Sequence, residues 1–250
     1  MRSNLVSVIM PAYNCKDLVG ISIESVINQS YENWELIIVD DCSTDYTFDV
    51  LEKYSNLDNR IKIYRQPVNM GVSNARNKAI EESKGRFIAF LDSDDIWKKT
   101  KLENQLKFMI ENDYAFTFTS YEIIEESGEK INKIFRAPFS IDYKGYLKNT
   151  IIGCLTVIID REKISNIKMP EGPLEDVLTW MSILKDNQVA YGLNQNLALY
   201  RITKGSISRN KIQNAKRYFI VLRERQNLSL IYSLYCHFNY TFNAVYKRLF

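Results

Sequence analysis

Short apolar runs alternate with amphipathic stretches over the first hundred residues of the chain. Two of these stretches, 44–54 and 72–83, have helical periodicity. The apolar runs have the length and composition of strands, and they lie at 5–10, 36–39, 61–64 and 87–91. This alternation predicts βαβ units around a mostly parallel sheet. Since the third run alternates apolar and polar residues, we expect it at a half-exposed edge.

Two further segments show which helix faces should be buried. Ile23 and Val26 mark the apolar side of a helix after the first run. Leu102, Leu106 and Met109 lie four and three residues apart after the fourth run, which is helical spacing. We therefore expect helices that cover the sheet.

Beyond residue 110 the pattern is less regular. Segments 114–122 and 155–160 are predicted strands, with a polar connection at 125–130. Pro173 favours the first position of a helix over 174–184. Apolar residues at 231–249 follow helical spacing for five turns. The whole pattern predicts one α/β domain followed by a helical tail.

Polar residues follow three of the predicted strands at their carboxyl ends. The first strand leads into residues 11–14, the second into Asp40 and Asp41, and the fourth into residues 92–95, which read DSDD. These ends share one edge of a parallel sheet, where open α/β folds bind ligands. Closely spaced carboxylates there suit a hard cation such as Mg²⁺ combined with substrate phosphates. The alternative is that these aspartates cap a helix that begins near Trp97.

Composition narrows the class of protein. With 250 residues, 46% hydrophobic and 25% charged, the chain has material for one sizeable core and is neither disordered nor collagen-like. Its four cysteines form no Cys-x-x-Cys pair and it has one histidine, so we expect reduced thiols in a cytoplasmic protein and no structural zinc. The N-terminus is too quickly polar for a signal peptide. The longest apolar windows, 151–159 and 228–238, are about half as long as a spanning helix.

Charge is unevenly distributed along the chain. Residues 201–250 carry ten Lys or Arg and one Glu, a net charge of +9, which leaves −6 on the first 200 residues. Three interpretations of this basic tail stay open: a helix packed on the domain, a helix on an anionic membrane surface, or nucleic-acid binding. No known nucleic-acid motif accompanies the charge, so we expect no nucleic-acid partner.

Four motifs together carry a family resemblance. They are residues 6–14 (VSVIMPAYN), 39–45 (VDDCSTD), 69–77 (NMGVSNARN) and 91–95 (LDSDD). In this order and spacing they resemble the inverting family 2 glycosyltransferases of GT-A fold, which is a Rossmann-like nucleotide-binding fold. The resemblance is close over about the first 110 residues. Family members usually carry Gly at the position of Cys42.

The resemblance implies a role for each matching residue of the first half. Asp41 would accept a hydrogen bond from the nucleobase of a UDP-sugar donor. Asp92, with Ser93, would contact the ribose. Asp94 would coordinate the Mn²⁺ or Mg²⁺ that bridges the donor diphosphate. The remaining residues expected to line the donor pocket are Pro11, Ala12, Tyr13, Asn14 and Arg76.

The resemblance also places the catalytic base in the second half, in residues 173–180 (PLEDVLTW). Asp176 would be the general base and Glu175 would support it or contact the acceptor. A carboxylate suits this role because it must take the proton of the attacking hydroxyl. The alternative is that acidic residues in a first helical turn complement the helix dipole. Trp180 would stack on a sugar ring or pack in the core.

The segment 200–208 resembles the part that follows the base in bacterial members of the family. Arg201, together with hydroxyl groups such as that of Ser206, would meet the diphosphate there. These expectations divide the chain into a GT-A domain at 1–205, with a nucleotide-sugar half at 1–110 and an acceptor half at 111–205, and a basic amphipathic tail at 206–250.

The predicted function is transfer of a hexose from a UDP-sugar to a saccharide acceptor. The resemblance to O-antigen and capsule enzymes implies an acceptor linked to undecaprenyl diphosphate and a peripheral position at the inner face of the cell membrane. Two alternatives remain from the residues alone. One is a sugar nucleotidyltransferase, although such enzymes carry a Gly-rich loop after the first strand. The other is a non-catalytic sugar-nucleotide-binding partner of a polysaccharide synthase.

Overall fold

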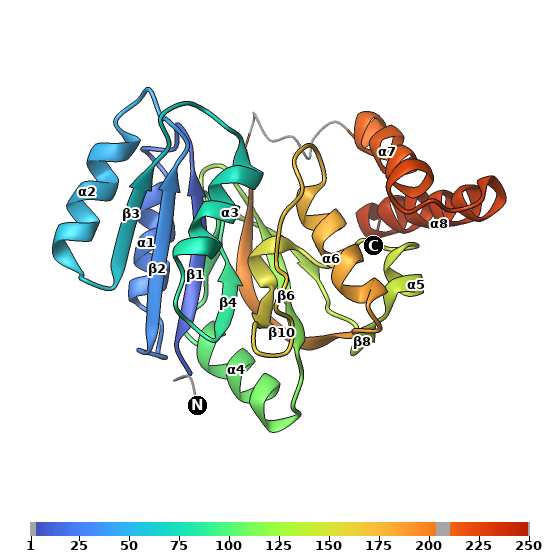
Figure 1. Ribbon diagram of the computed structural model, residues 1–250, viewed down its shortest axis with the longest axis horizontal. Helices are drawn as coiled ribbons and strands as arrows, with labels where there is room; N and C mark the ends of the chain where they lie inside the picture. The colour runs from blue at the N-terminus through green and yellow to red at the C-terminus, as the bar shows by residue number, and fades with distance from the viewer. Residues whose placement is uncertain (1–3, 204–210, 250) are drawn as a thin grey trace.

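A ten-stranded sheet runs through the centre of the protein (Figure 1). The computed structural model describes residues 4–203 and 211–249, with side chains over 4–203 and 213–244. The strands follow the order β3-β2-β1-β4-β9-β6-β10-β5, while β7 pairs with β6 and β8 with β10.

The first half of the sheet is parallel, as predicted. It contains β1 (Val6–Ala12), β2 (Trp34–Asp40), β3 (Ile61–Arg65) and β4 (Phe87–Phe90). All residues of β1, β2 and β4 are buried, whereas β3 is a partly exposed edge, which confirms that expectation. The helices of this half are α1 (Val19–Ile27), α2 (Thr47–Leu57) and α3 (Val72–Glu82).

The second half of the sheet is mixed. β9 (Ile158–Asp160) lies antiparallel to both β4 and β6 (Phe116–Glu125), and β10 (Ala190–Ile202) is parallel to β6. The polar connection at 125–130 contains the turn between β6 and β7, and sequence analysis missed both β7 and β10. The other elements are β5 (Ile96–Trp97), α4 (Lys101–Glu111), β7 (Lys130–Phe135), β8 (Ser140–Ile141), α5 (Tyr143–Tyr146), a 3₁₀ turn at Cys154–Thr156 and α6 (Glu175–Lys185).

Two helix starts differ from their predicted positions. The structure has a short strand at Trp97 and α4 begins only at Lys101, so residues 92–95 do not cap a helix. Helix α6 begins at Glu175, two residues after Pro173. Between them Leu174 adopts a left-handed conformation with φ of 63°. This sharp bend turns the chain into α6.

The tail consists of α7 (Lys211–Ile220), a π-helical turn (Val221–Arg225) and α8 (Leu230–Leu249). It packs beside α5 and α6 at one end of the molecule (Figure 1). The Tyr218 hydroxyl donates to the Leu147 carbonyl at 2.7 Å, and the Tyr143 hydroxyl donates to Gln226 Oε1 at 2.7 Å. In the described part of the chain, no helix combines the length and hydropathy that crossing a membrane requires.

Candidate active site

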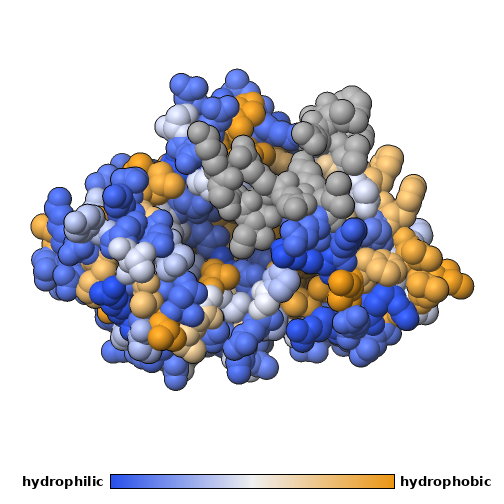
Figure 2. Space-filling model, turned by 90° about the horizontal axis from the view of Figure 1, so that it is seen from above, coloured by the Kyte–Doolittle hydropathy of each residue, from blue (hydrophilic) through white to orange (hydrophobic). Residues whose placement is uncertain are grey.

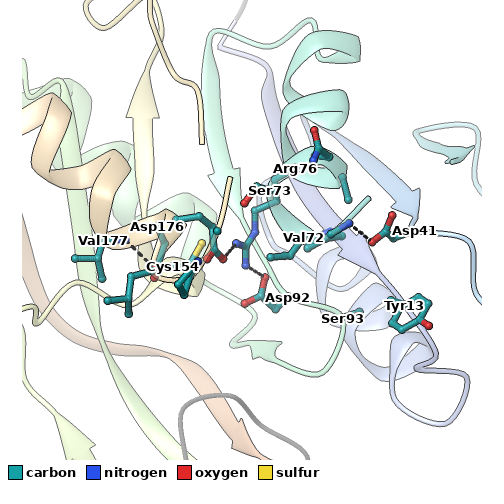
Figure 3. A pocket seen from close by; sticks show the side chains of 18 of the residues that line it. Tyr13, Asp41, Val72, Ser73, Arg76, Asp92, Ser93, Cys154, Asp176 and Val177 are labelled. Atoms are coloured by element: carbon teal, nitrogen blue, oxygen red, sulfur yellow. Dashed lines mark hydrogen bonds and ion pairs between the residues drawn. The ribbon is translucent and has the colours of Figure 1, made fainter. Parts of the chain in front are cut away.

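A pocket of about 1040 Å³ opens where β1, β2 and β4 end (Figure 3). Figure 2 shows a hollow in the middle of the same face of the molecule. The parallel topology brings these strand ends together, and the start of α6 closes the pocket from the second half. The predicted site residues among its lining are Pro11, Ala12, Tyr13, Asp41, Arg76, Asp92, Ser93, Asp94, Glu175 and Asp176.

Asp41 joins the end of β2 to the start of α3. Its two carboxylate oxygens accept from the backbone amides of Met70 and Gly71, each at 2.7 Å. Gly71 has φ of 87°, a conformation that glycine adopts without steric penalty. Each carboxylate oxygen has a second lone pair, so Asp41 can still accept a hydrogen bond from a ligand.

The loop after β1 is braced by the loop after β2. Asn14 does not line the pocket: its backbone amide donates to Ser43 Oγ at 3.0 Å, and its side-chain Oδ1 accepts from the Thr44 backbone amide at 2.8 Å. Cys42 lies in the left-handed region with φ of 61°. That conformation favours glycine, the residue that the family resemblance leads us to expect at this position. This chain makes the same turn with a side chain.

Arg76 connects the donor side of the pocket to α6. It is 4% exposed, and its guanidinium pairs with Asp92 Oδ1 at 2.5 Å and with Glu175 Oε1 at 2.7 Å (Figure 3). Met169 Sδ lies 3.9 Å from Nη1 on the same side chain. Arg76 therefore fixes the relative position of two acidic segments from different halves of the chain.

The loop after β4 concentrates negative charge. Burial, reinforced by the charge of Asp92, raises the pKa of Asp94 to about 6. Burial and the charge of Asp94 also raise the pKa of Asp95, whose Oδ2 is buried without a hydrogen-bond partner among the described residues. No ion pair to Asp94 or Asp95 is found in that same part of the chain. A cation bound here would relieve this repulsion, so the donor set fits a divalent metal.

The described residues contain no preformed group of three His, Cys, Asp or Glu side chains around a metal position. This is compatible with Mg²⁺ or Mn²⁺ sites of the kind in which one or two carboxylates act together with substrate phosphates. Asp94 is the candidate ligand because it lines the pocket, whereas Asp95 is 1% exposed and does not.

Arg201 stabilises this loop from behind and does not line the pocket. It is 3% exposed, its amide donates to Asp95 Oδ1 at 2.9 Å, and its Nε donates to the Asp94 carbonyl at 2.8 Å. Its Nη1 donates to the Glu126 carbonyl at 2.9 Å. The structure therefore assigns Arg201 contacts with the aspartate loop instead of the expected place beside a diphosphate. Ser206 lies outside the described residues.

Asp176 lies in the first turn of α6 and faces the pocket (Figure 3). Its Oδ1 accepts from the Val177 amide at 2.8 Å. Burial, together with the charge of Glu175, raises the pKa of Asp176 to about 6. A carboxylate with this pKa is ionised at neutral pH and is a stronger base than an exposed aspartate.

Trp180 is one helical turn further along α6 and is completely buried. Its ring contacts Phe90 and Phe116, each with a centroid distance of 5.4 Å. Of the two interpretations of this residue, the structure favours core packing over stacking on a sugar.

Among the lining residues that sequence analysis did not identify, four come from elements far along the chain. Tyr121 on β6 and Tyr200 on β10 line the pocket, and α7 contributes Asn214 and Arg217. No signal in the sequence indicates that the basic tail returns to the pocket. Arg217 matters electrostatically because Arg76, the other basic lining residue, is already paired with two carboxylates.

Solved structures with related folds support the architecture. TarS 1-349 of S. aureus in complex with UDP-GlcNAc aligns with a TM-score of 0.71 and 22% identity, over 88% of this chain and 66% of TarS. The mannosyltransferase PcManGT from Pyrobaculum calidifontis was solved in complex with GDP-Man and Mn²⁺. It aligns with a TM-score of 0.69 and 16% identity, over 90% of this chain and 65% of PcManGT. This chain spans just under two thirds of the length of either solved chain.

Sequence relatives are closer. TuaG of Bacillus subtilis strain 168, which bears the name of a teichuronic acid biosynthesis glycosyltransferase, is 49% identical over 98% of both chains. WfgD of Escherichia coli is 43% identical over 100% of this chain and 97% of its own. Its name is UDP-Glc:alpha-D-GlcNAc-diphosphoundecaprenol beta-1,3-glucosyltransferase. The model of "Glycosyl transferase family 2" matches residues 7–165. With both the motifs and the fold in agreement, this chain belongs to glycosyl transferase family 2 and is a glycosyltransferase of GT-A fold.

Proposed function

We propose that the protein is a metal-dependent, inverting hexosyltransferase that uses a UDP-sugar donor and an acceptor sugar linked to undecaprenyl diphosphate. The observation that carries the proposal is the single pocket that joins the carboxylates after β2 and β4 to Asp176 of α6. Donor-binding groups and a base thus face the same space. Membership of the glycosyltransferase family argues against the nucleotidyltransferase alternative.

The relatives support the choice of substrates. The name of WfgD describes a UDP-glucose donor and an acceptor carried on diphosphoundecaprenol. TarS was solved with UDP-GlcNAc, and PcManGT with Mn²⁺. Four free cysteines suit a reducing cytoplasm, and a lipid-linked acceptor would keep the enzyme at the inner face of the membrane.

The proposed chemistry follows from the positions of the residues. Asp41 and the loop after β1 hold the nucleoside, with Asp92 and Ser93 at the ribose. Asp176 takes the proton of the acceptor hydroxyl while that oxygen forms a bond to the anomeric carbon and the bond to UDP breaks. Asp94 would hold the metal, which when bound would supply positive charge to offset that of the diphosphate. Arg76 keeps Asp92 and the first turn of α6 in fixed positions.

Calorimetric titration tests the donor site directly. UDP, GDP and CMP are titrated into the protein with Mn²⁺ and again with EDTA. We expect UDP to bind selectively, and EDTA to weaken its binding by at least about tenfold, because a metal held by Asp94 would offset the charge of the diphosphate. Equal affinity for the three nucleotides would contradict the uridine assignment. Binding that EDTA leaves unchanged would contradict the metal assignment.

Asp176→Asn tests the base. The substitution removes the proton acceptor and preserves size, so turnover should fall by about 10²- to 10⁴-fold while the affinity for UDP stays unchanged. Transfer is measured with radiolabelled UDP-sugars on a lipid-diphosphate acceptor. Asp186→Asn is the control, because Asp186 follows the far end of α6. Near-normal turnover of Asp176→Asn would exclude it as the base.

A further inference from the structure

Helix α8 has apolar residues on two opposite sides. On one side Ser233 and Cys236 are fully buried and Tyr240 stacks on Tyr218, with a centroid distance of 4.1 Å. On the other side large apolar side chains are exposed. At 3.6 residues per turn they lie within about 140° of arc. We call them the α8 outer face: Leu230 (54% exposed), Ile231 (82%), Leu234 (52%), Tyr235 (50%), Phe238 (70%) and Phe242 (60%).

Charge is absent from this helix except at its ends. Residues 226–246 contain no Lys, Arg, Asp or Glu, whereas Arg223 and Arg225 precede this segment and Lys247 and Arg248 follow it. Arg223 and Arg225 are exposed. An apolar stripe that contains aromatic rings and is flanked by cations matches the boundary between lipid headgroups and acyl chains. Neighbouring large apolar side chains that are each at least half exposed are typical of an interaction site.

Helix α7 connects the helix that carries the outer face to the pocket lining. Helix α7, which leads into α8, contributes Asn214 and Arg217 to the pocket lining. Figure 2 shows hydrophobic residues gathered at the end of the molecule where α8 lies, and the hollow is visible in the same view. A surface that contacts α8 would therefore be connected to the pocket lining through α7.

We propose that the α8 outer face binds an anionic lipid bilayer, with the helix parallel to the membrane in the headgroup region. This deepens the proposed function, since a lipid-linked acceptor stays in the membrane, but the contact itself requires neither sugar nor nucleotide. The described helices include none that crosses a membrane, so the contact is made from one side. The bound helix holds the pocket at the height of the acceptor headgroup.

Charge favours a bilayer over a second copy of the chain. In a two-fold pair of antiparallel α8 helices, the arginines at 223 and 225 of one copy would meet Lys247 and Arg248 of the other. These like charges repel, and Glu224 is the sole acidic residue of the tail. Anionic headgroups attract the same cations at both ends of the helix.

Vesicle co-sedimentation tests the proposal without donor or acceptor. The probe is phosphatidylcholine vesicles with and without about one third phosphatidylglycerol, a composition that supplies negative surface potential. The test variant is Ile231→Ser/Phe238→Ser. The matched control is Leu57→Ser/Phe139→Ser, because these side chains are 71% and 68% exposed and lie outside the tail. Circular dichroism melting checks that each variant is folded.

We expect the full chain to bind the anionic vesicles and to release them as salt increases. The test variant should lose at least about tenfold in partitioning, and the control should bind like the unmodified protein. Absence of binding, or equal binding by the test variant, would overturn the proposal. So would a dimer that the test variant converts to a monomer, because the face would then belong to a second copy. Calorimetry with UDP reports on the proposed function separately.

Discussion

Cys42 adopts a backbone conformation that disfavours most side chains. At φ of 61° the Cβ atom of an L-residue crowds its own backbone, which costs about 1 kcal/mol relative to glycine. Its thiol makes one long contact, 3.7 Å from Sγ to the Pro67 carbonyl. The residue therefore stores strain in a turn next to Asp41.

Cys42→Gly should stabilise the protein. Release of the strain is expected to raise the free energy of unfolding by about 1 kcal/mol, or the melting temperature by about 2–4 °C. Cys42→Ala is the control: it removes the thiol but keeps a Cβ atom, so it should give no increase. Differential scanning calorimetry measures both. If the alanine variant gains as much as the glycine variant, the thiol and not the backbone is the source of the effect.

Asp176 should make the folded state depend on pH. Its pKa is about 6 in the folded protein and about 4 in an unfolded chain, so the folded state binds the proton more tightly. Stability from this group is thus present below pH 4 and lost as pH rises from 4 to 6. Asparagine does not ionise, so the Asp176→Asn variant does not lose this stability as pH rises. At pH 7.5 its free energy of unfolding should exceed that of the unmodified protein by on the order of 1 kcal/mol. Urea unfolding at pH 7.5 and pH 4 measures the difference. If the variant gained the same free energy of unfolding at both pH values, ionisation of Asp176 would not be the cause of the gain.

Some of the site could be predicted at the scale of single residues. The aspartates after β2 and β4 were identified because topology alone brings the ends of parallel strands together. Trp180 could not be placed, since helical spacing puts it on the same face as Asp176 but does not say how far the pocket extends along α6. One turn separates an aspartate at the pocket from a tryptophan inside the core.

At the scale of elements, Arg76 holds three segments together. It extends from α3 to Asp92 after β4 and to Glu175 at the start of α6. A planar guanidinium can bind two carboxylates at once, whereas an ammonium group is a single compact charge. The orientation of α6 therefore depends on a residue about 100 positions earlier in the chain.

Arg76→Lys should weaken this connection and keep the positive charge. We expect the free energy of unfolding to fall by about 1–3 kcal/mol, because one partly buried carboxylate loses a charged hydrogen bond to the buried Arg76. Arg60→Lys is the control, since Arg60 also pairs with an aspartate, Asp58, but its side chain is 34% exposed. This substitution should lower the free energy of unfolding by less than about 1 kcal/mol. Urea unfolding compares the two. Equal losses would show that the buried geometry of Arg76 has no special effect.

The elements that sequence analysis missed have irregular patterns. Strand β10 contains Asn194, Gln195 and Asn196, where its pairing with β6 shifts register, so the apolar alternation is interrupted. Strand β7 pairs with β6 but is largely exposed and carries two lysines, which leaves little hydrophobic signal. Helices α3 and α4 were found because their buried faces follow a regular period.

At the scale of the whole molecule, the tail shares the core of the domain. Tyr218, Val221, Leu222 and Cys236 belong to the same hydrophobic cluster as Trp180 of α6. Sequence analysis predicted a helical tail, with helical spacing over 231–249, but left open whether it packs on the domain, lies on a membrane or binds nucleic acid. The structure shows packing on one side of α8 and leaves the other side exposed, so the two interpretations are compatible.

Leu222→Ala tests the shared core. Leu222 is fully buried, so the truncation should lower the free energy of unfolding by about 2–4 kcal/mol within one cooperative transition. Ile220→Ala is the control because that side chain is 50% exposed, and it should cost less than about 1 kcal/mol. Calorimetric and fluorescence melts measure both. Two separate transitions would indicate that the tail unfolds independently.

The ion pair between Arg76 and Glu175 also affects which chimeras of this chain with another family member would keep the orientation of α6. The proposed donor motifs lie before residue 96, and the proposed base lies on α6 after a mixed set of strands. Recombination after β4 would join the donor half of one enzyme to the acceptor half of another. Such a chimera inherits a fully formed Arg76 pair only if the incoming half carries a carboxylate at position 175. The orientation of α6 in such a chimera therefore depends on one ion pair at the junction of the two halves.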